Sequence, residues 1–169
     1  MLIATKVRLY PTPGQRRFLN GQFGAVRFCY NKAVALKRDL YRKKGISLSV
    51  IKEIKPLLSV AKKSRKYGWL SQYDSMSLQE AVRHADTAYK RFFKKEARFP
   101  QFKSKRNRQS SYHCTSLSVG KDFIKIPKCE PIKAVIHRPI QGKVKSITVS
   151  RDRVGDYFAS ILSETPEKV

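Results

Sequence analysis

Positively charged side chains, set among aromatic ones, are the residues of this sequence whose types and spacing could do chemistry. One run spans residues 90–108, where only Glu96 opposes the cations. Its members are Lys90, Arg91, Lys94, Lys95, Arg98, Lys103, Lys105, Arg106 and Arg108. A second cluster precedes Tyr67 and Trp69 and consists of Lys62, Lys63, Arg65 and Lys66. Ammonium and guanidinium groups suit phosphates, so both runs are predicted to bind a nucleic-acid backbone.

Phenylalanines are interleaved with the first run. Exposed aromatic faces can stack on unpaired bases, which makes Phe99 and Phe102 candidates for base stacking. Phe92 and Phe93 continue the apolar stripe of a predicted helix, so we expect them in the core. Trp69 is likewise expected to be a core anchor.

The charge of the whole chain supports a polyanionic partner. The sequence has 169 residues, with 37 Lys and Arg against 12 Asp and Glu, a formal charge of +25. Self-repulsion of this size opposes compaction unless a polyanion neutralises it. No apolar run approaches the roughly 20 residues of a spanning helix, and the N-terminus lacks the apolar core of a signal peptide. We therefore expect nucleic acid, not a membrane, as the partner.

No arrangement of residues predicts catalysis or a bound metal. The acidic residues lie mostly on polar helix faces or in turns, whereas two-metal hydrolysis needs several carboxylates in one pocket. The sequence has neither a phosphate-binding loop of the GxxxxGK[ST] type nor a His-apolar-His pair. Cys29, Cys114 and Cys129 form no CxxC pair, which argues against structural zinc and favours a reducing cytoplasm.

The N-terminal half is predicted to be one strand followed by helices. Residues 2–10 alternate apolar and polar side chains, a strand period. Thr12 with Gln15 three residues later resembles a capping box, and Pro13 suits the first helical position. The helix is expected to run to Lys43, with a break near Gly21 or Gly24, and Ser49 is expected to cap a shorter helix.

A second long helix and a set of short strands follow. Asp74, Ser75 or Ser77 can cap the helix, with Ser77 and Glu80 as an alternative capping box. It ends in an extended segment around Pro100. Strands are expected at residues 112–119, 123–126, 134–138, 144–150 and 157–162. This order predicts an α+β fold, with a small β-barrel of residues 1–10 and 109–165 and a helical insertion of residues 11–108.

Several short phrases, in this order, resemble the N-terminal half of TnpB, also called OrfB, a transposon-encoded RNA-guided DNA endonuclease related to type V CRISPR effectors. They are Val7-Arg8-Leu9-Tyr10-Pro11, Arg27-Phe28-Cys29-Tyr30-Asn31, Trp69-Leu70, Leu78-Gln79, Ala88-Tyr89-Lys90-Arg91-Phe92-Phe93, Phe99-Pro100-Gln101-Phe102-Lys103 and Ile126-Pro127-Lys128. Each phrase is weakly specific alone, and together they cover nearly the whole chain.

The resemblance implies a wedge domain, an oligonucleotide-binding-like β-barrel, that carries an inserted helical recognition domain. It implies structured guide RNA and target double-stranded DNA as partners, with the oligomeric state open. In that family, cutting is done by a RuvC-type nuclease followed by a zinc ribbon. We expect both beyond this sequence, and we expect Mg²⁺ only with the nuclease.

The resemblance also suggests which residues face a short DNA motif beside the target. They lie mainly at the start of the second long helix and are Ser75, Met76, Gln79, Glu80 and Leu48. Glutamine can bond the N6/N7 edge of adenine, which makes Gln79 the leading candidate. Ser75 and Met76 stand where one relative has lysine and phenylalanine, and Leu48 where it has tyrosine, so a different motif is expected.

Three functional hypotheses remain at this stage. The first is a non-catalytic module that binds guide RNA and recognises a DNA motif as half of an RNA-guided endonuclease. The second is a nuclease-dead, RNA-guided repressor of transcription that works by itself. The third is an enzyme that cuts or joins DNA unaided, which would need a metal site among the acids. The first is favoured, with no catalytic residue in this chain.

Overall fold

The computed structural model describes residues 1–105 and 110–166 of the chain. The chain divides into two compact units. The sheet unit comprises Met1–Phe23 and Arg106–Val169, and the helical unit comprises Gly24–Lys105. Helices and strands occur in separate segments, which confirms the α+β class. Arg106 and Arg108, both predicted to contact nucleic acid, lie outside the described residues.

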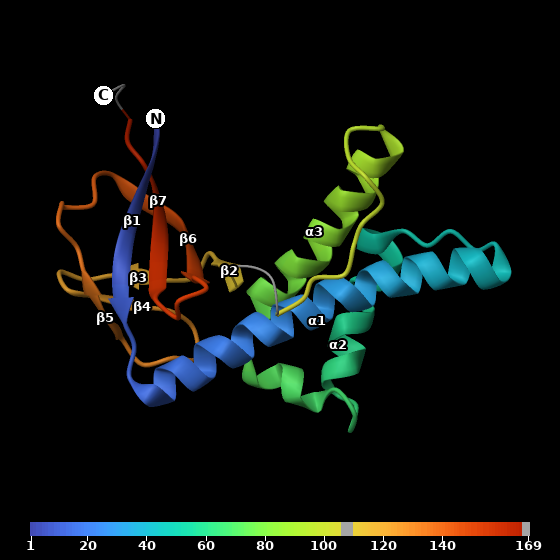
Figure 1. Cartoon of the computed structure of the whole chain (residues 1–169), viewed down its shortest axis with the longest axis horizontal. Coiled ribbons are helices and arrows are strands. Elements are labelled where there is room, and N and C mark those ends of the chain that lie inside the picture. Colours follow the sequence, from blue (N-terminus) through green and yellow to red (C-terminus); the bar gives the residue numbers. More distant parts are fainter. Residues whose placement is uncertain (106–109, 167–169) are drawn as a thin grey trace. The chain divides into compact units, whose positions relative to one another are not determined.

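The sheet unit is built on one antiparallel sheet in the order β2-β6-β7-β1-β5-β4-β3 (Figure 1). Its strands are β1 (Leu2–Tyr10), β2 (Ser110–Cys114), β3 (Ser118–Val119), β4 (Phe123–Lys125), β5 (Ile132–Val135), β6 (Lys143–Arg151) and β7 (Tyr157–Glu164). The N-terminal strand β1 lies at the middle of the sheet because it pairs with β7 on one side and β5 on the other. The first and last segments of the chain therefore depend on each other for their hydrogen bonds.

The sheet is a curled half-barrel and not the closed barrel expected from the sequence. Closure requires every strand to have two neighbours. Among the described residues, however, β2 pairs only with β6 and β3 pairs only with β4, so β2 and β3 are the two edge strands of the sheet. The expected strand at residues 112–119 is also divided. The chain bends after Cys114, whose thiol donates to the Ser116 carbonyl at 3.3 Å, and only two residues then form β3.

The core of the sheet unit follows the alternation of its strands. Val7 and Leu9 of β1 are buried, as are Ile147 of β6 and Ile161 of β7. Burying a side chain of this size stabilises the fold by about 1.5–3 kcal/mol. The first turns of helix α1 (Pro13–Lys44) add Leu19 and Phe23, and the Phe23 ring meets Tyr112 of β2 edge-on at 5.7 Å. This helix start thus belongs to the core of the sheet unit.

The start of α1 confirms the predicted capping box. The Thr12 amide donates to Gln15 Oε1 at 2.9 Å, and the Gln15 amide donates to Thr12 Oγ1 at 3.2 Å. The Gln15 side-chain amide also donates to the carbonyls of Glu130 and Pro131, which ties the helix to the loop before β5. The expected break near Gly21 or Gly24 is wrong. The helix is continuous to Lys44 because single glycines inside a helix cost only about 1 kcal/mol each, which packing offsets.

The helical unit contains the rest of α1 and four shorter elements. They are a π-helical turn η1 (Val50–Ile54), α2 (Leu57–Lys62), a 3₁₀ turn η2 (Gly68–Gln72) and α3 (Ser75–Phe93). Ser49 caps η1 as predicted, since its hydroxyl accepts from the Lys52 amide at 3.2 Å. The buried Tyr89 hydroxyl of α3 donates to the Val34 carbonyl of α1 at 2.7 Å, which joins the two long helices.

Both ends of α3 have defined caps. Asp74 is the N-cap, so the alternative box at Ser77 and Glu80 does not form, and the Ser77 hydroxyl donates to Asp74 instead. At the other end Lys95 is left-handed, with φ of 62°. Its amide donates to the Phe92 carbonyl, and the Glu96 amide donates to the Arg91 carbonyl, a Schellman motif. Glycine normally fills that position, so a lysine there is strained.

Among the described residues, no helix combines the length and apolar content needed to cross a bilayer.

The left-handed backbone of Lys95 leads to a stability prediction. Lys95→Gly is expected to have a free energy of unfolding about 1 kcal/mol higher than Lys94→Gly, because glycine relieves strain only at the left-handed position. Its urea midpoint should therefore be the higher of the two. Both variants lose one positive charge, so the difference isolates the backbone. Equal midpoints for the two variants would contradict a strained Lys95.

Candidate nucleic-acid interface

The segment that follows α3 runs beside α1 and is held there by hydrogen bonds between an α1 side chain and the backbone of the segment. The Asn31 side-chain amide donates to the Lys103 carbonyl at 2.9 Å, and the Lys103 amide donates to Asn31 Oδ1 at 2.8 Å. This pair of bonds satisfies one backbone residue in the way that a strand partner would. Pro100 is buried, and the Lys103 ammonium lies 4.3 Å from the centre of the Tyr30 ring. The phrases at residues 27–31 and 99–103, which are far apart in the sequence, are thus brought together.

The aromatic residues of the interface divide between core and surface. Phe99 is half-buried and meets Tyr89 and Phe92 edge-on, with ring centroids 5.5 and 5.1 Å apart. Phe102 is 49% exposed and has the Arg38 guanidinium 4.8 Å from its ring centre. Of the two stacking candidates, Phe102 therefore offers more ring to a base.

Two aromatic residues expected in the core are partly at the surface. Phe93 is 66% exposed, because it lies in the last turn of α3, where this helix has diverged from α1 (Figure 1). Its ring packs on Tyr89 and Phe92 of its own helix. Trp69 is 39% exposed and packs one edge against Phe28 at 5.3 Å. The apolar stripe predicts which side of the helix faces the core, but it does not predict over what length a second helix packs against that side.

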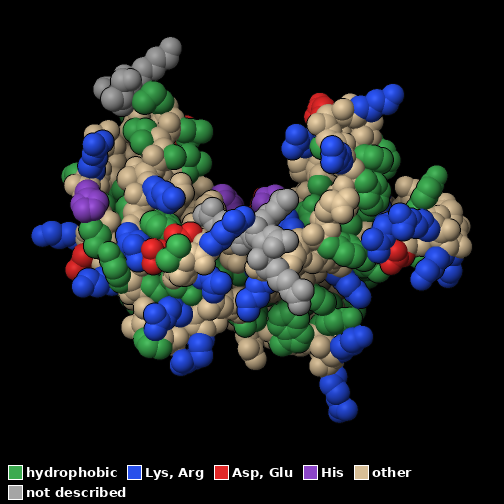
Figure 2. Space-filling model, viewed as in Figure 1, with side chains coloured by type: hydrophobic (Ala, Val, Ile, Leu, Met, Phe, Trp, Pro, Cys, Tyr) green, Lys and Arg blue, Asp and Glu red, His purple; other side chains and the backbone are tan. Residues whose placement is uncertain are grey.

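The predicted backbone-binding cations lie mostly at the surface of the helical unit. Lys62 is half-buried, and the exposed members are Lys63, Arg65, Lys66, Lys90, Arg91, Lys94, Lys95, Arg98, Lys103 and Lys105. Lys90 forms an ion pair with Asp86 at 2.9 Å, and Lys62 donates to Ser75 at 2.8 Å. Figure 2 shows blue Lys and Arg side chains over much of the visible surface and few red acidic ones. A polyanion would meet positive charge with little competition from acids.

The predicted DNA-facing residues at the start of α3 form a small polar group. The Ser75 hydroxyl accepts from Lys62 and also from the Gln79 side-chain amide at 3.2 Å. All three residues line a depression of about 290 Å³ with residues of η1 and α2. Met76 is 44% exposed in the same helical turn. The structure therefore brings Gln79 and Ser75 together with a cation, a partner that the sequence alone did not assign to them.

Glu80 and Leu48 have a different setting. Glu80 accepts from Arg83 at 3.1 Å and lies 3.5 Å from His84, so its charge is used within α3. Leu48 is half-buried before η1, and its carbonyl accepts from the Lys37 ammonium.

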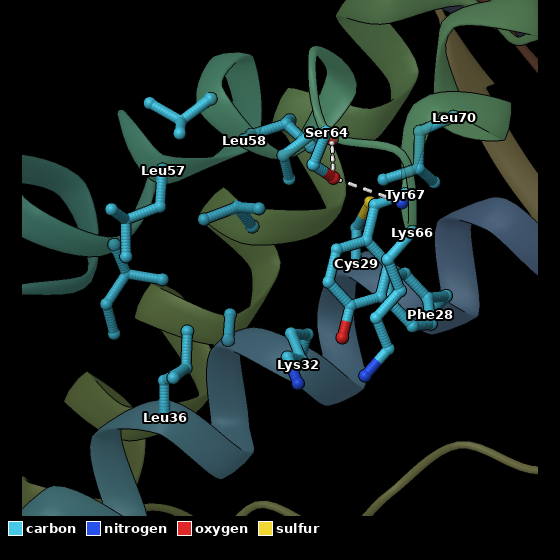
Figure 3. A pocket seen from close by; sticks show the side chains of 15 residues that line it. Phe28, Cys29, Lys32, Leu36, Leu57, Leu58, Ser64, Lys66, Tyr67 and Leu70 are labelled. Atoms are coloured by element: carbon cyan, nitrogen blue, oxygen red, sulfur yellow. Dashed lines mark hydrogen bonds between the residues drawn. The ribbon is translucent and has the colours of Figure 1, made fainter.

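An apolar pocket lies in the helical unit between α1 and α2 (Figure 3). At its mouth the Tyr67 oxygen accepts hydrogen bonds from Lys32 and Lys66, which lower the pKa of that phenol. Cys29 lines the wall, and burial raises the pKa of its thiol to about 12, only partly offset by the charge of Lys62. This thiol is therefore protonated and unreactive at neutral pH.

A basic aromatic patch on the sheet unit was not predicted from the sequence. On the outer side of β1, the Lys6 ammonium lies 4.5 Å from the Phe158 ring centre, and the Arg8 guanidinium carbon lies 5.1 Å from the Tyr10 ring centre. Arg8 also forms an ion pair with Asp156 at 2.8 Å. The signal was present, because the strand alternation places these cations on the face opposite Val7 and Leu9.

The described residues contain no group of three or more His, Cys, Asp or Glu side chains arranged to hold a metal ion.

One sequence family and three curated relatives match the chain. The family described as the helix-turn-helix domain of OrfB proteins from IS605 elements matches residues 1–45. In this structure those residues form β1 and the continuous helix α1, so they contain no turn between two helices. The match identifies a related sequence and does not show a helix-turn-helix fold here.

Three curated relatives align with the chain. Virulence protein VsdF of Salmonella dublin is 52% identical over 62% of this chain and 95% of its own length. A candidate RNA-guided DNA endonuclease of Streptomyces pristinaespiralis is 32% identical over 95% of this chain and 41% of its own length. The candidate RNA-guided DNA endonuclease InsQ of Escherichia coli K12 is 28% identical over 97% of this chain and 41% of its own length. The chain thus spans less than half the length of the two endonuclease relatives.

The link between Asn31 and Lys103 can be tested directly. Asn31→Ala removes both hydrogen bonds, so the Lys103 amide is expected to exchange its hydrogen at least tenfold faster, in line with a drop of about 1–2 kcal/mol in local protection. Gln101→Ala is the control, since its side chain bonds to the nearby Phe99 carbonyl. Unchanged exchange in Asn31→Ala would show that other interactions hold the segment.

Proposed function

Because the chain belongs to the TnpB/OrfB family of insertion-sequence proteins, we propose that it binds a structured guide RNA and recognises a short DNA motif beside the target. It would do so as the recognition part of an RNA-guided DNA endonuclease. The partners are a folded RNA and a DNA duplex. This chain contributes binding and positioning, and no catalytic step is assigned to its residues.

The observation that carries the proposal is the exposed basic segment after α3, residues 94–105. Its cations project from a backbone that Asn31 and buried Pro100 hold in place. A fixed backbone reduces the conformational entropy that its side chains lose on binding, so a phosphate chain of matching shape is favoured. An RNA with a defined fold has such a shape, and A-form RNA is recognised mostly through its backbone and shape.

The division of the chain supports a particular domain arrangement. The sheet unit is discontinuous, and the helical unit lies between its two parts in the sequence. We assign the wedge domain to the sheet unit and the recognition domain to the helical unit. The curled sheet, with Lys6, Arg8 and Tyr10 on its outer face, supplies cations and rings of the kind found on oligonucleotide-binding sheets.

For the DNA motif we assign the start of α3. Its first turn presents exposed Met76, and Gln79 lies one turn beyond Ser75 along the helix. Gln79 donates to Ser75 in the absence of DNA, and its amide would exchange that bond for a base edge in the major groove. Lys62, which donates to the same serine, would then contact a phosphate.

Cutting of DNA is assigned to the part of the longer relatives that the alignments do not cover. Mg²⁺, which that chemistry uses, has no role in the binding proposed here.

RNA binding is tested by affinity across a salt series. The parent chain is expected to lose affinity for a structured RNA steeply as salt rises. Changing Lys94, Arg98 and Lys105 to Gln should reduce the magnitude of the negative slope of log K against log salt by roughly 0.7–0.9 for each phosphate that is no longer neutralised. Arg42, Lys43 and Lys44 at the end of α1 give a control with the same change in charge. Equal slopes for the two triple variants would contradict the assignment.

DNA-motif recognition is tested by selecting duplexes from a randomised library with the RNA-loaded protein. Gln79→Ala is expected to abolish the preference at one position and to weaken binding of the preferred duplex about tenfold, the value of one bidentate base contact. Thr87→Ala, an exposed change on the same helix, is the control. The same base preference in Gln79→Ala and parent would remove Gln79 from the interface.

A further inference from the structure

We propose that the apolar pocket of the helical unit receives the base of one unstacked nucleotide, while Lys32 and Lys66 at its mouth contact the adjoining phosphate. This site rests on the proposed function, because it takes the bound nucleic acid as its ligand. Lys66 is one of the predicted phosphate-binding cations, whereas the sequence predicted no pocket for a base beside it.

The pocket has the size and lining of a ligand site. Its volume is about 370 Å³, within the range of roughly 300–1,000 Å³ typical of small-molecule pockets. Leu57 and Val60 on its wall are 47% and 64% exposed, so apolar surface remains open to solvent. Filling it with an apolar or aromatic group would remove that surface from water.

The polar groups on the wall are already used within the protein. The Ser64 hydroxyl donates to the Ala61 carbonyl at 2.7 Å and accepts from the Tyr67 amide at 3.1 Å, as the dashed lines in Figure 3 show. The Cys29 thiol is buried and protonated. The wall therefore meets a ligand through its apolar surface, and the polar edge of that ligand has to face the mouth.

Positive charge is concentrated at one side of the mouth. The Lys32 and Lys66 ammonium groups lie 5.6 and 5.3 Å from the Tyr67 ring centre. Figure 3 shows the polar ends of all three side chains on the same side, whereas Leu36 and Leu57 lie toward the opposite end. Two cations close together on an apolar cavity match a ligand with an apolar body and an anionic group.

A nucleotide fits this pattern better than a purely aliphatic anion does, because part of the wall is aromatic. Phe28 and Tyr67 lie 5.4 Å apart between ring centroids, and both line the pocket. Such faces stack on any base. Since the Ser64 hydroxyl is engaged within the protein and the Cys29 thiol is buried, neither reads a base edge, and binding is expected to be independent of base identity. The site would hold a guide or opened DNA strand in register without reading its sequence.

The single tryptophan of the chain can report on the pocket. Trp69 contacts Phe28 at 5.3 Å, so a base that moves Phe28 should change Trp69 emission. The probes are a short oligoadenylate and the same oligomer with abasic sugars. The parent is expected to change its emission with the first probe and not with the second, and to bind the second about tenfold more weakly, the effect of removing one base stack.

Two variants separate the base from the phosphate. Ala61→Phe fills the pocket, so it should abolish the emission change and weaken the oligoadenylate about tenfold, to the affinity of the abasic oligomer. Lys32→Ala with Lys66→Ala should weaken the oligoadenylate about tenfold, because two cations no longer face the phosphate. Lys43→Ala with Lys44→Ala removes the same charge from the end of α1 and is the matched control. A thermal melt confirms that each variant is folded.

Several outcomes would overturn the site. These are an equal emission change with abasic oligomer, an unchanged response in Ala61→Phe, or a response to decanoate and not to oligoadenylate. The last would indicate a pocket for aliphatic anions. If structured RNA binds normally while the emission test fails, only the pocket assignment is wrong. If no nucleic acid binds at all, the proposed function fails with it.

Discussion

Repulsion among cations is the constraint on which the rest of this structure depends. With 37 basic and 12 acidic residues, most cations cannot have an acidic partner. Several of the described ion pairs are local, such as Lys90 with Asp86 one turn away on α3. Exposed pairs of this kind contribute little stability. The fold therefore relies on its apolar cores, and a bound polyanion would stabilise it further by neutralising charge and by mass action.

Hydrogen bonds from side chains to the backbone help to determine where the positive charge lies on the surface. Asn31 holds the backbone of Lys103, and Gln15 holds the carbonyls of Glu130 and Pro131. The Lys125 ammonium donates to the carbonyls of Ile126 and Cys129 and closes the turn on which Lys128 lies. Lys95 and Lys128 both have left-handed backbone, which costs stability. The chain thus accepts local strain and uses polar side chains to keep exposed lysines on defined backbone.

Helix α1 contributes buried side chains to both hydrophobic cores. Its first turns carry Leu19 and Phe23 into the sheet unit, and its later turns carry Ala33 and Val34 into the helical unit. The family described as a helix-turn-helix matches this region, yet the segment is one strand and one uninterrupted helix. A sequence family and a local fold are separate findings, and only the first carries the relationship to insertion-sequence proteins.

The sequence by itself determined whatever depends on neighbours along the chain. The capping box at Thr12, the end of α1 before Gly45, the cap at Ser49 and the alternation of β1 all follow from local backbone hydrogen bonding and side-chain periodicity. The α+β class, the basic run and the resemblance also came from sequence.

Tertiary structure decided everything set by distant partners. It left the sheet open, exposed Phe93 where α3 diverges from α1, joined Asn31 to Lys103, and formed the pocket beside Tyr67. These features depend on packing between segments many residues apart, for which periodicity and composition carry no distance information.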